Sequence, residues 1–249
     1  MGCLPGGKGV NIRQRVALPG AFIVLRLPAR CGAMRVLKVW GRTTSVNVQK
    51  VMWAVAELGI PHERIDAGGA FGVVDKPEYA ALNPNRLVPT IQDGDVTLWE
   101  SAAIVRYLAR KYGVASLLPK GEPQIAVADQ WMTWADTTLY AALISTIFIG
   151  LIRTPAAERN QQAVETAIQR VGEKLAILDG LLVNRPYIMG DALTMADISS
   201  GALMYRYFTL PIARPSLPNV ECWYKRLAGR PAYKTHVMVD YNVLRVAGA

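Results

Sequence analysis

A glutamate and a serine, Glu100-Ser101, stand where a short apolar, strand-like segment gives way to a helical pattern. Serine is a preferred residue at the N-terminal cap of a helix, so we expect Ser101 to cap the helix that follows. The free N–H groups of a first helical turn can hold an anion, and the carboxylate of Glu100 can pair with an ammonium group. The pair therefore predicts either a ligand site or an ordinary helix cap.

The cysteines and histidines point to little chemistry of their own. The three cysteines, Cys3, Cys31 and Cys222, are odd in number and have no CxxC spacing. They predict neither a disulfide framework nor a metal site, and they fit a reducing compartment such as the cytoplasm. His62 and His236 have no ligand or catalytic partner nearby in the sequence. We therefore expect no metal.

The elements that must position Glu100 and Ser101 follow from hydrophobic periodicity. Apolar residues at helical spacing predict helices, and short apolar runs beside turn signals predict strands, with Asp93-Gly94 as the turn of a hairpin. The expected strands cover 35–40, 61–65 and the two arms of 88–98, and the expected helices cover 46–58, 77–82 and 101–112. The order is βαβαββα, which is an α/β arrangement.

The composition changes after Gly113, where Leu118 to Pro123 reads as a linker. Beyond it the pattern predicts only helices, over about 123–151, 156–183, 194–208 and 217–228. We therefore expect an α/β N-terminal domain at 34–113, a linker at 114–122 and an all-α C-terminal domain at 123–249. Residues 1–33 are expected to be a disordered leader, or an extension that precedes the true start at Met34.

The net charge of +9 invites an interpretation as a nucleic-acid-binding protein. The first 33 residues, however, carry basic side chains and no acidic one, so much of the excess belongs to the leader. We therefore expect no nucleic-acid partner. The longest apolar stretches, such as Ala141 to Ile152, are too short and too interrupted to cross a bilayer, so we also expect no membrane partner.

Three motifs resemble the cytosolic glutathione transferase family over Met34 to about Tyr233. The first is NPNRLVPTI at 83–91, the second is WESAAI at 99–104, and the third is GDALTMADI at 190–198. Val-Pro followed eleven residues later by Glu-Ser is a specific pairing in that family. The third motif fits a capping box from Thr194 to Asp197, whose role is in folding.

The resemblance implies a thioredoxin-like N-terminal domain that binds glutathione as a co-substrate. In that family the bond before Pro89 is cis, and the backbone of Val88 meets the glutathione cysteine. Glu100 and Ser101 then hold the γ-glutamyl group. Lys76 or Arg86 is a candidate for the glycine carboxylate.

The resemblance also places the residue that activates the thiol between the first strand and the first helix. A hydrogen-bond donor at a helix N-terminus lowers the pKa of a thiol by favouring the thiolate. Ser45 and Asn47 are equal candidates for this donor, with Thr44 as a third. The segment contains no tyrosine and no cysteine, which indicates a serine- or asparagine-type enzyme of bacterial kind.

The function implied is attack of the glutathione thiolate on a small electrophile, as in detoxification. Two alternatives stay open, a glutathione-dependent disulfide-bond reductase or peroxidase, and a non-catalytic binding module. Aromatic side chains of the first C-terminal helix are candidates to hold the second substrate: Trp131, Trp134, Tyr140 and Phe148. Relatives are homodimers in which the partner often supplies an acidic residue, here Asp129 or Asp136.

Overall fold

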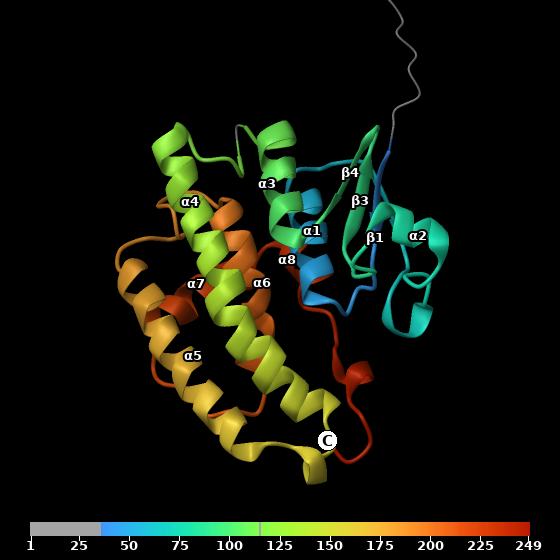
Figure 1. Cartoon of the computed structure of the whole chain (residues 1–249). Helices are drawn as coiled ribbons and strands as arrows, with labels where there is room; N and C mark the ends of the chain where they lie inside the picture. The colour runs from blue at the N-terminus through green and yellow to red at the C-terminus, as the bar shows by residue number, and fades with distance from the viewer. Residues whose placement is uncertain (1–35, 115) are drawn as a thin grey trace, which may run out of the picture. The chain divides into compact units, whose positions relative to one another are not determined.

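The computed structural model describes residues 36–114 and 116–249 of the chain. Four short strands form a sheet in the order β2-β1-β3-β4 (Figure 1). They are β1 (Leu37–Trp40), β2 (His62–Ile65), β3 (Thr90–Asp93) and β4 (Val96–Trp99). β2 runs parallel to β1, whereas β3 is antiparallel to β1 and β4 is antiparallel to β3.

Three helices accompany this sheet in the predicted order. α1 (Val46–Glu57) and α3 (Ser101–Tyr112) pack against each other on one side, and α2 (Pro77–Leu82) lies on the other (Figure 1). A short 3₁₀ turn, η1 (Gly69–Phe71), stands between β2 and α2. The predicted βαβαββα arrangement is confirmed, with boundaries that shift by one or two residues.

The rest of the described chain is helical, as predicted. α4 (Glu122–Trp134) continues through two π-helical stretches, η2 (Ala135–Leu139) and η3 (Ala141–Arg153). The other predicted helices are α5 (Gln161–Leu181), α6 (Met195–Thr209) and α7 (Pro218–Ala228). α5 begins five residues after the predicted helix start at 156, where the structure has a short 3₁₀ turn, η4 (Ala156–Glu158). Two short elements were not predicted: α8 (Pro231–His236) and η5 (Asn242–Leu244).

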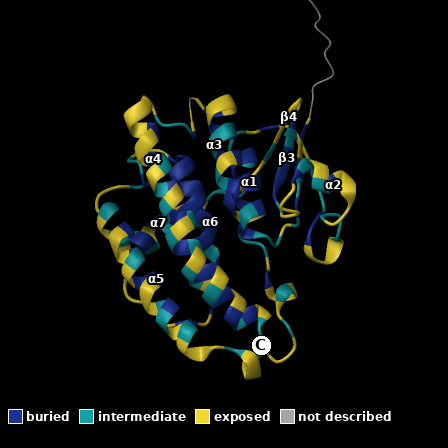
Figure 2. Ribbon diagram, in the orientation of Figure 1, coloured by how far each residue is buried: buried dark blue, intermediate teal, exposed yellow. Residues whose placement is uncertain are grey.

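α6 is the central helix of this region and is buried along most of its length (Figure 2). It packs against α1, α3, α4 and α7. The predicted capping box is present at its start, where the Thr194 N–H donates to Asp197 Oδ2 over 2.9 Å. Asp197 Oδ1 also accepts hydrogen bonds from the Ile188 N–H and the Trp223 indole, each at 3.0 Å. One buried carboxylate thus ties the start of α6 to two distant segments.

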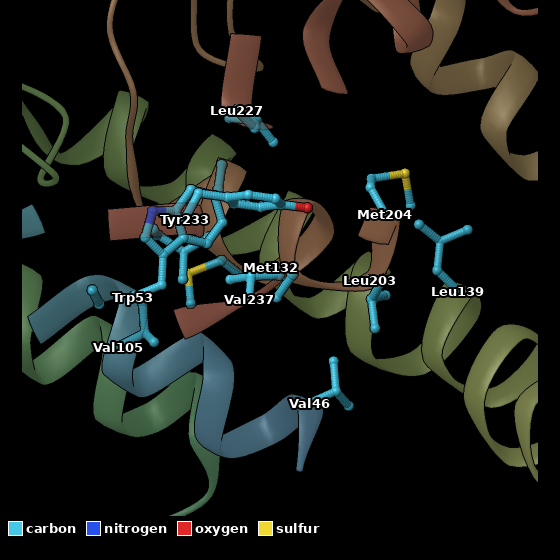
Figure 3. Packing of buried hydrophobic residues seen from close by; sticks show 14 of the residues in the cluster. Val46, Trp53, Val105, Met132, Leu139, Leu203, Met204, Leu227, Tyr233 and Val237 are labelled. Atoms are coloured by element: carbon cyan, nitrogen blue, oxygen red, sulfur yellow. The ribbon is translucent and has the colours of Figure 1, made fainter. Parts of the chain in front are cut away.

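Aromatic packing joins α1 to the C-terminal helices (Figure 3). The rings of Trp53 and Tyr233 meet edge to face, with centroids 4.8 Å apart. Gly201 permits this close approach of α6, because a Cβ atom there would lie 2.7 Å from Leu227 and 3.0 Å from Trp53. The first and last thirds of the chain therefore share one core.

The expectation that every apolar stretch is too short to cross a membrane is wrong on length. Glu122–Arg153 is one unbroken helix of 32 residues, long and apolar enough by composition to do so. One such helix is weak evidence, because core helices of soluble proteins pass the same test. Its apolar residues include buried Met132, Leu139 and Ile147 of the hydrophobic core.

The expected leader and the proposed start at Met34 lie outside the described residues. The predicted division at 114–122 stays a prediction. The described residues between α3 and α4 form turns rather than helix or strand.

Candidate active site

The ends of three strands meet at one edge of the sheet. Trp40 of β1 pairs with Thr90 of β3, which in turn pairs with Trp99 of β4. The segment 41–45, the Val88-Pro89 bond and Glu100 are the next residues beyond this row, so they converge at the same edge. The sequence predicted each of these residues separately, and the strand register brings them together.

Ser45 occupies the N-cap position of α1. Its backbone is extended and its carbonyl accepts the first helical hydrogen bond, from the Gln49 N–H at 2.9 Å. Its side chain makes no capping hydrogen bond. The half-buried hydroxyl of Ser45 therefore remains available to donate to a ligand at the positive end of the helix dipole.

Asn47, in the first turn of α1, bridges three elements. Its Oδ1 accepts a hydrogen bond from the Ser101 hydroxyl of α3 at 3.3 Å, and its Nδ2 donates to the Tyr140 hydroxyl at 3.5 Å. Both contacts are long for hydrogen bonds, so the amide keeps capacity for a further acceptor. Burial, the larger influence, raises the pKa of Tyr140, against the opposing effect of the Asn47 hydrogen bond, so its hydroxyl stays neutral.

The prediction that Ser101 caps α3 is wrong. The helix begins at Ser101, and Glu100 holds the N-cap position with a left-handed backbone, φ 70°. Because Ser101 already belongs to the first turn, its buried hydroxyl points toward Asn47 instead of capping. The first-turn N–H groups of α3 still lack partners within the helix, and the exposed Glu100 immediately precedes them in the chain.

The predicted cis bond before Pro89 is confirmed. The carbonyl of Leu87 accepts hydrogen bonds from the Tyr79 hydroxyl at 2.6 Å and from Asn83 Nδ2 at 2.8 Å. These contacts hold the chain before the half-buried Val88 in place against α2. The backbone of Val88 is thereby fixed at the sheet edge.

Arg42 is a residue near this edge that sequence reasoning did not single out. A Cβ atom on Gly68 would lie 3.3 Å from both the Arg42 guanidinium and the Val88 side chain, so these two groups flank the same glycine. The Nε atom of Arg42 is buried and has no hydrogen-bond partner. Burial, followed by repulsion from Arg153, lowers the pKa of Arg42. Its position two residues after the end of β1 was the available signal.

Several other predicted residues are placed less directly. Lys76 and Arg86 are exposed, and no described hydrogen bond joins either of them to the sheet edge. Trp131 and Trp134 contact each other edge to face at 5.1 Å, whereas Phe148 is a core residue packed on Tyr241. Tyr140 is the aromatic candidate whose hydroxyl contacts Asn47.

Both acidic residues expected to serve a partner subunit are engaged within their own chain. Asp129 pairs with Arg106 at 2.6 Å, and Asp136 pairs with the buried Lys50 at 2.5 Å. The described residues contain no group of three His, Cys, Asp or Glu side chains that could hold a metal ion.

Comparison with known proteins identifies the family to which the chain belongs. Models of the glutathione S-transferase N-terminal and C-terminal domains match residues 44–111 and 140–231. The chain is 38% identical over 208 residues to glutathione S-transferase GstB of Escherichia coli K12, covering 83% of this chain and 100% of that protein. It is 31% identical over 212 residues to glutathione S-transferase 1 of Triticum aestivum, covering 80% of this chain and 92% of that one.

Solved structures agree with this result. The theta class glutathione S-transferase of Xanthomonas axonopodis pv. citri, with glutathione bound, matches with a TM-score of 0.79 at 44% identity, over 83% of this chain and 99% of that chain. Glutathione S-transferase I from maize, in complex with an atrazine glutathione conjugate, matches with a TM-score of 0.74 at 28% identity, over 82% and 98% of the two chains. The chain therefore belongs to the glutathione S-transferase family.

Proposed function

We propose that the chain is a glutathione transferase whose thiol-activating residue is Ser45 or Asn47. The observation that carries this proposal is the convergence of the α1 N-terminus, the cis Val88-Pro89 bond and the α3 N-terminus at one sheet edge. The contact between Asn47 and Ser101 supports it further, because it joins the activating segment to the candidate γ-glutamyl site.

Glutathione would lie across this edge in one orientation. Its γ-glutamyl carboxylate would accept hydrogen bonds from the first-turn N–H groups of α3 and its ammonium would pair with Glu100. Its cysteine would meet the backbone of Val88 and present the sulfur to the N-terminus of α1. Lys76 and Arg86 remain candidates for the glycine carboxylate, and Arg42 joins them as the cation that flanks Gly68 beside Val88.

The chemistry begins with loss of the thiol proton. A free thiol has a pKa of about 8.5 and is mostly protonated at neutral pH. A hydroxyl or amide donor and the helix dipole favour the thiolate and so lower that pKa. The thiolate sulfur then forms a bond to the electrophilic carbon, and the leaving group departs with the bonding electron pair.

The ultraviolet absorbance of the bound glutathione thiolate, measured against pH, tests the proposal directly. We expect a pKa at least one unit below that of free glutathione in the wild type. The Ser45→Ala and Asn47→Ala variants then separate the two candidates, because the variant that loses the depression identifies the donor. Thr44→Ala tests the third candidate; since the described contact of Thr44 with Arg206 is made by its backbone carbonyl, we expect this variant to keep the wild-type thiol pKa.

Other outcomes distinguish the alternatives. Binding without any depression of the thiol pKa would indicate a non-catalytic module, and absence of binding would overturn the glutathione site itself. A lowered pKa without product from small electrophiles, but with reduction of disulfides or peroxides, would indicate the reductase or peroxidase alternative.

We propose further that the enzyme acts in the cytoplasm as a homodimer, with a small electrophile as second substrate and without a nucleic-acid or membrane partner. The family resemblance supports this assembly. Light scattering coupled to gel filtration measures the mass, and a mass of one 27.2 kDa chain would contradict the dimer.

A further inference from the structure

A buried arginine of the helical region contacts the activating segment. Arg206 lies on α6 and is 2% exposed. One terminal nitrogen donates to the carbonyl oxygen of Thr44 at 2.8 Å, and the other donates to Gln49 Oε1 at 2.8 Å. Gln49 in turn donates from Nε2 to the carbonyl oxygen of Thr43 at 2.8 Å. The carbonyls of both residues before Ser45 are therefore held, directly or through one amide, by Arg206.

This arrangement fixes a particular peptide plane. The carbonyl of Thr44 and the N–H of Ser45 belong to one planar peptide unit. Arg206 binds its oxygen, and the carbonyl oxygen of Arg42 accepts its N–H at 3.2 Å. With both sides bound, the plane cannot rotate freely, so the direction in which the Ser45 side chain leaves the backbone is set.

The positive charge of Arg206 is buried without an ion pair to a carboxylate of the described residues. Among the described residues no carboxylate pairs with Arg206, and its Nε atom is buried without a partner. The guanidinium lies over the rings of Phe148 and Tyr241, at 5.0 Å and 5.8 Å from their centroids. Burial lowers its pKa to about 10, which keeps it charged at neutral pH. A charge buried with only neutral acceptors is costly to the fold, which favours a functional reason for it.

We propose that Arg206 is a positioning residue for thiol activation. It acts through the Thr44-Ser45 peptide unit, holding the Ser45 hydroxyl and the start of α1 in the geometry that stabilises the glutathione thiolate. The inference rests on the proposed function, because it assigns a support to the same activating segment. It also makes α6, a helix outside the thioredoxin-like domain, part of the machinery that sets the thiol pKa.

The C-terminal end of α1 offers a matched control. Arg230, which immediately precedes α8, donates to both carboxylate oxygens of Glu57 in the last turn of α1, at 2.7 Å and 2.6 Å. Arg206 and Arg230 thus both anchor α1 to the C-terminal helices, but Arg206 alone of the two contacts the segment before Ser45. Replacing either one removes a comparable anchor.

The experiment compares Arg206→Met, Arg206→Lys and Arg230→Met in the full chain, each at a urea concentration and temperature where it is fully folded. The readouts are the pKa of the bound glutathione thiol and the separate values of kcat and KM with 1-chloro-2,4-dinitrobenzene. We expect Arg206→Met to raise the pKa of the bound thiol by about one unit. At pH values below the thiol pKa, kcat should therefore fall about tenfold, while the KM for glutathione changes less than about threefold.

Arg206→Lys keeps the charge, but a single ammonium group does not reproduce the two guanidinium hydrogen bonds to Thr44 and Gln49. We therefore expect the lysine variant to recover less than half of the shift in the thiol pKa. Arg230→Met should keep the wild-type thiol pKa and kcat. A wild-type thiol pKa in Arg206→Met, full recovery in Arg206→Lys, or an equal shift in Arg230→Met would each overturn the positioning role. If Arg206→Met does not fold, the lysine variant with the Arg230 control still decides.

The proposed function fails in a different way. In that case the wild type itself shows no depressed thiol pKa, whatever the variants do. A depressed wild-type pKa that is unaffected at Arg206 refutes only the positioning role.

Discussion

Replacing Asp197 by alanine should cost a large part of the stability of this protein. The carboxylate is fully buried and accepts the N–H groups of Ile188 and Thr194 and the indole N–H of Trp223, at 2.9 to 3.0 Å. Each buried donor left without a partner costs about 1–3 kcal/mol. Burial raises the pKa of the Asp197 carboxyl group to about 6, which means that burying the charged carboxylate has a cost. The alanine variant removes that cost.

The relief offsets part of the loss, so we expect Asp197→Ala to lower the free energy of unfolding by about 3–5 kcal/mol. This is a large fraction of the roughly 5–15 kcal/mol by which domains are stable. Equilibrium urea unfolding at pH 7, followed by tryptophan fluorescence and by circular dichroism, measures it, and coincidence of the two curves checks that unfolding is two-state.

Asp179 supplies the control. Its carboxylate accepts the N–H groups of Asn219 and Val220 at 2.9 Å at the start of α7, but it is only half-buried, so water can replace it. We expect Asp179→Ala to cost about 1 kcal/mol, the usual value of a helix cap. The reasoning would be refuted if Asp197→Ala lost no more stability than Asp179→Ala.

Three further predictions concern other parts of the molecule. Burial raises the pKa of Asp93, but hydrogen bonds from Lys111 and two tyrosines outweigh burial, so the net pKa is lowered. The ionised Asp93 carboxylate therefore stabilises the fold above about pH 4, and this stabilisation is lost as the pH falls further. Asp93→Asn should therefore weaken the acid dependence of the unfolding midpoint below pH 4, and an unchanged dependence would contradict this. Gly201→Ala should destabilise the protein by about 1–3 kcal/mol, because the added Cβ atom would overlap Leu227. A Cβ atom at Gly180 in α5 would meet nothing within 4 Å, so Gly180→Ala should stabilise the protein by about 0.5 kcal/mol. Thermal unfolding measures both changes. Asn47→Asp places a negative charge beside the thiolate and should raise the thiol pKa by at least about one unit, visible as a shift of the pH–rate profile.

The local elements could be predicted because they depend on near neighbours in the chain. The spacing of Val48, Val51 and Val55 predicts a helix, and the Asp93-Gly94 turn predicts a hairpin, without any distant contact. The short helix α8 escaped prediction, because its six residues are not followed by a turn signal such as the Asn83-Pro84-Asn85 that ends α2, a helix of the same length. The cap at Ser101 was misplaced by one residue, since serine propensity cannot foresee the left-handed backbone of Glu100.

The amino-acid sequence was sufficient to predict the βαβαββα order, the helical remainder, the capping box at Asp197 and the family motifs around Val88 and Ser101. Which side chains meet at the site became known from the three-dimensional fold. Asn47 reaches Ser101 across 54 residues, and Arg206 reaches the Thr44 carbonyl across 162. Such contacts depend on how sheet register and helix packing bring remote segments together. A local pattern of residue types carries no information on which remote segments will meet.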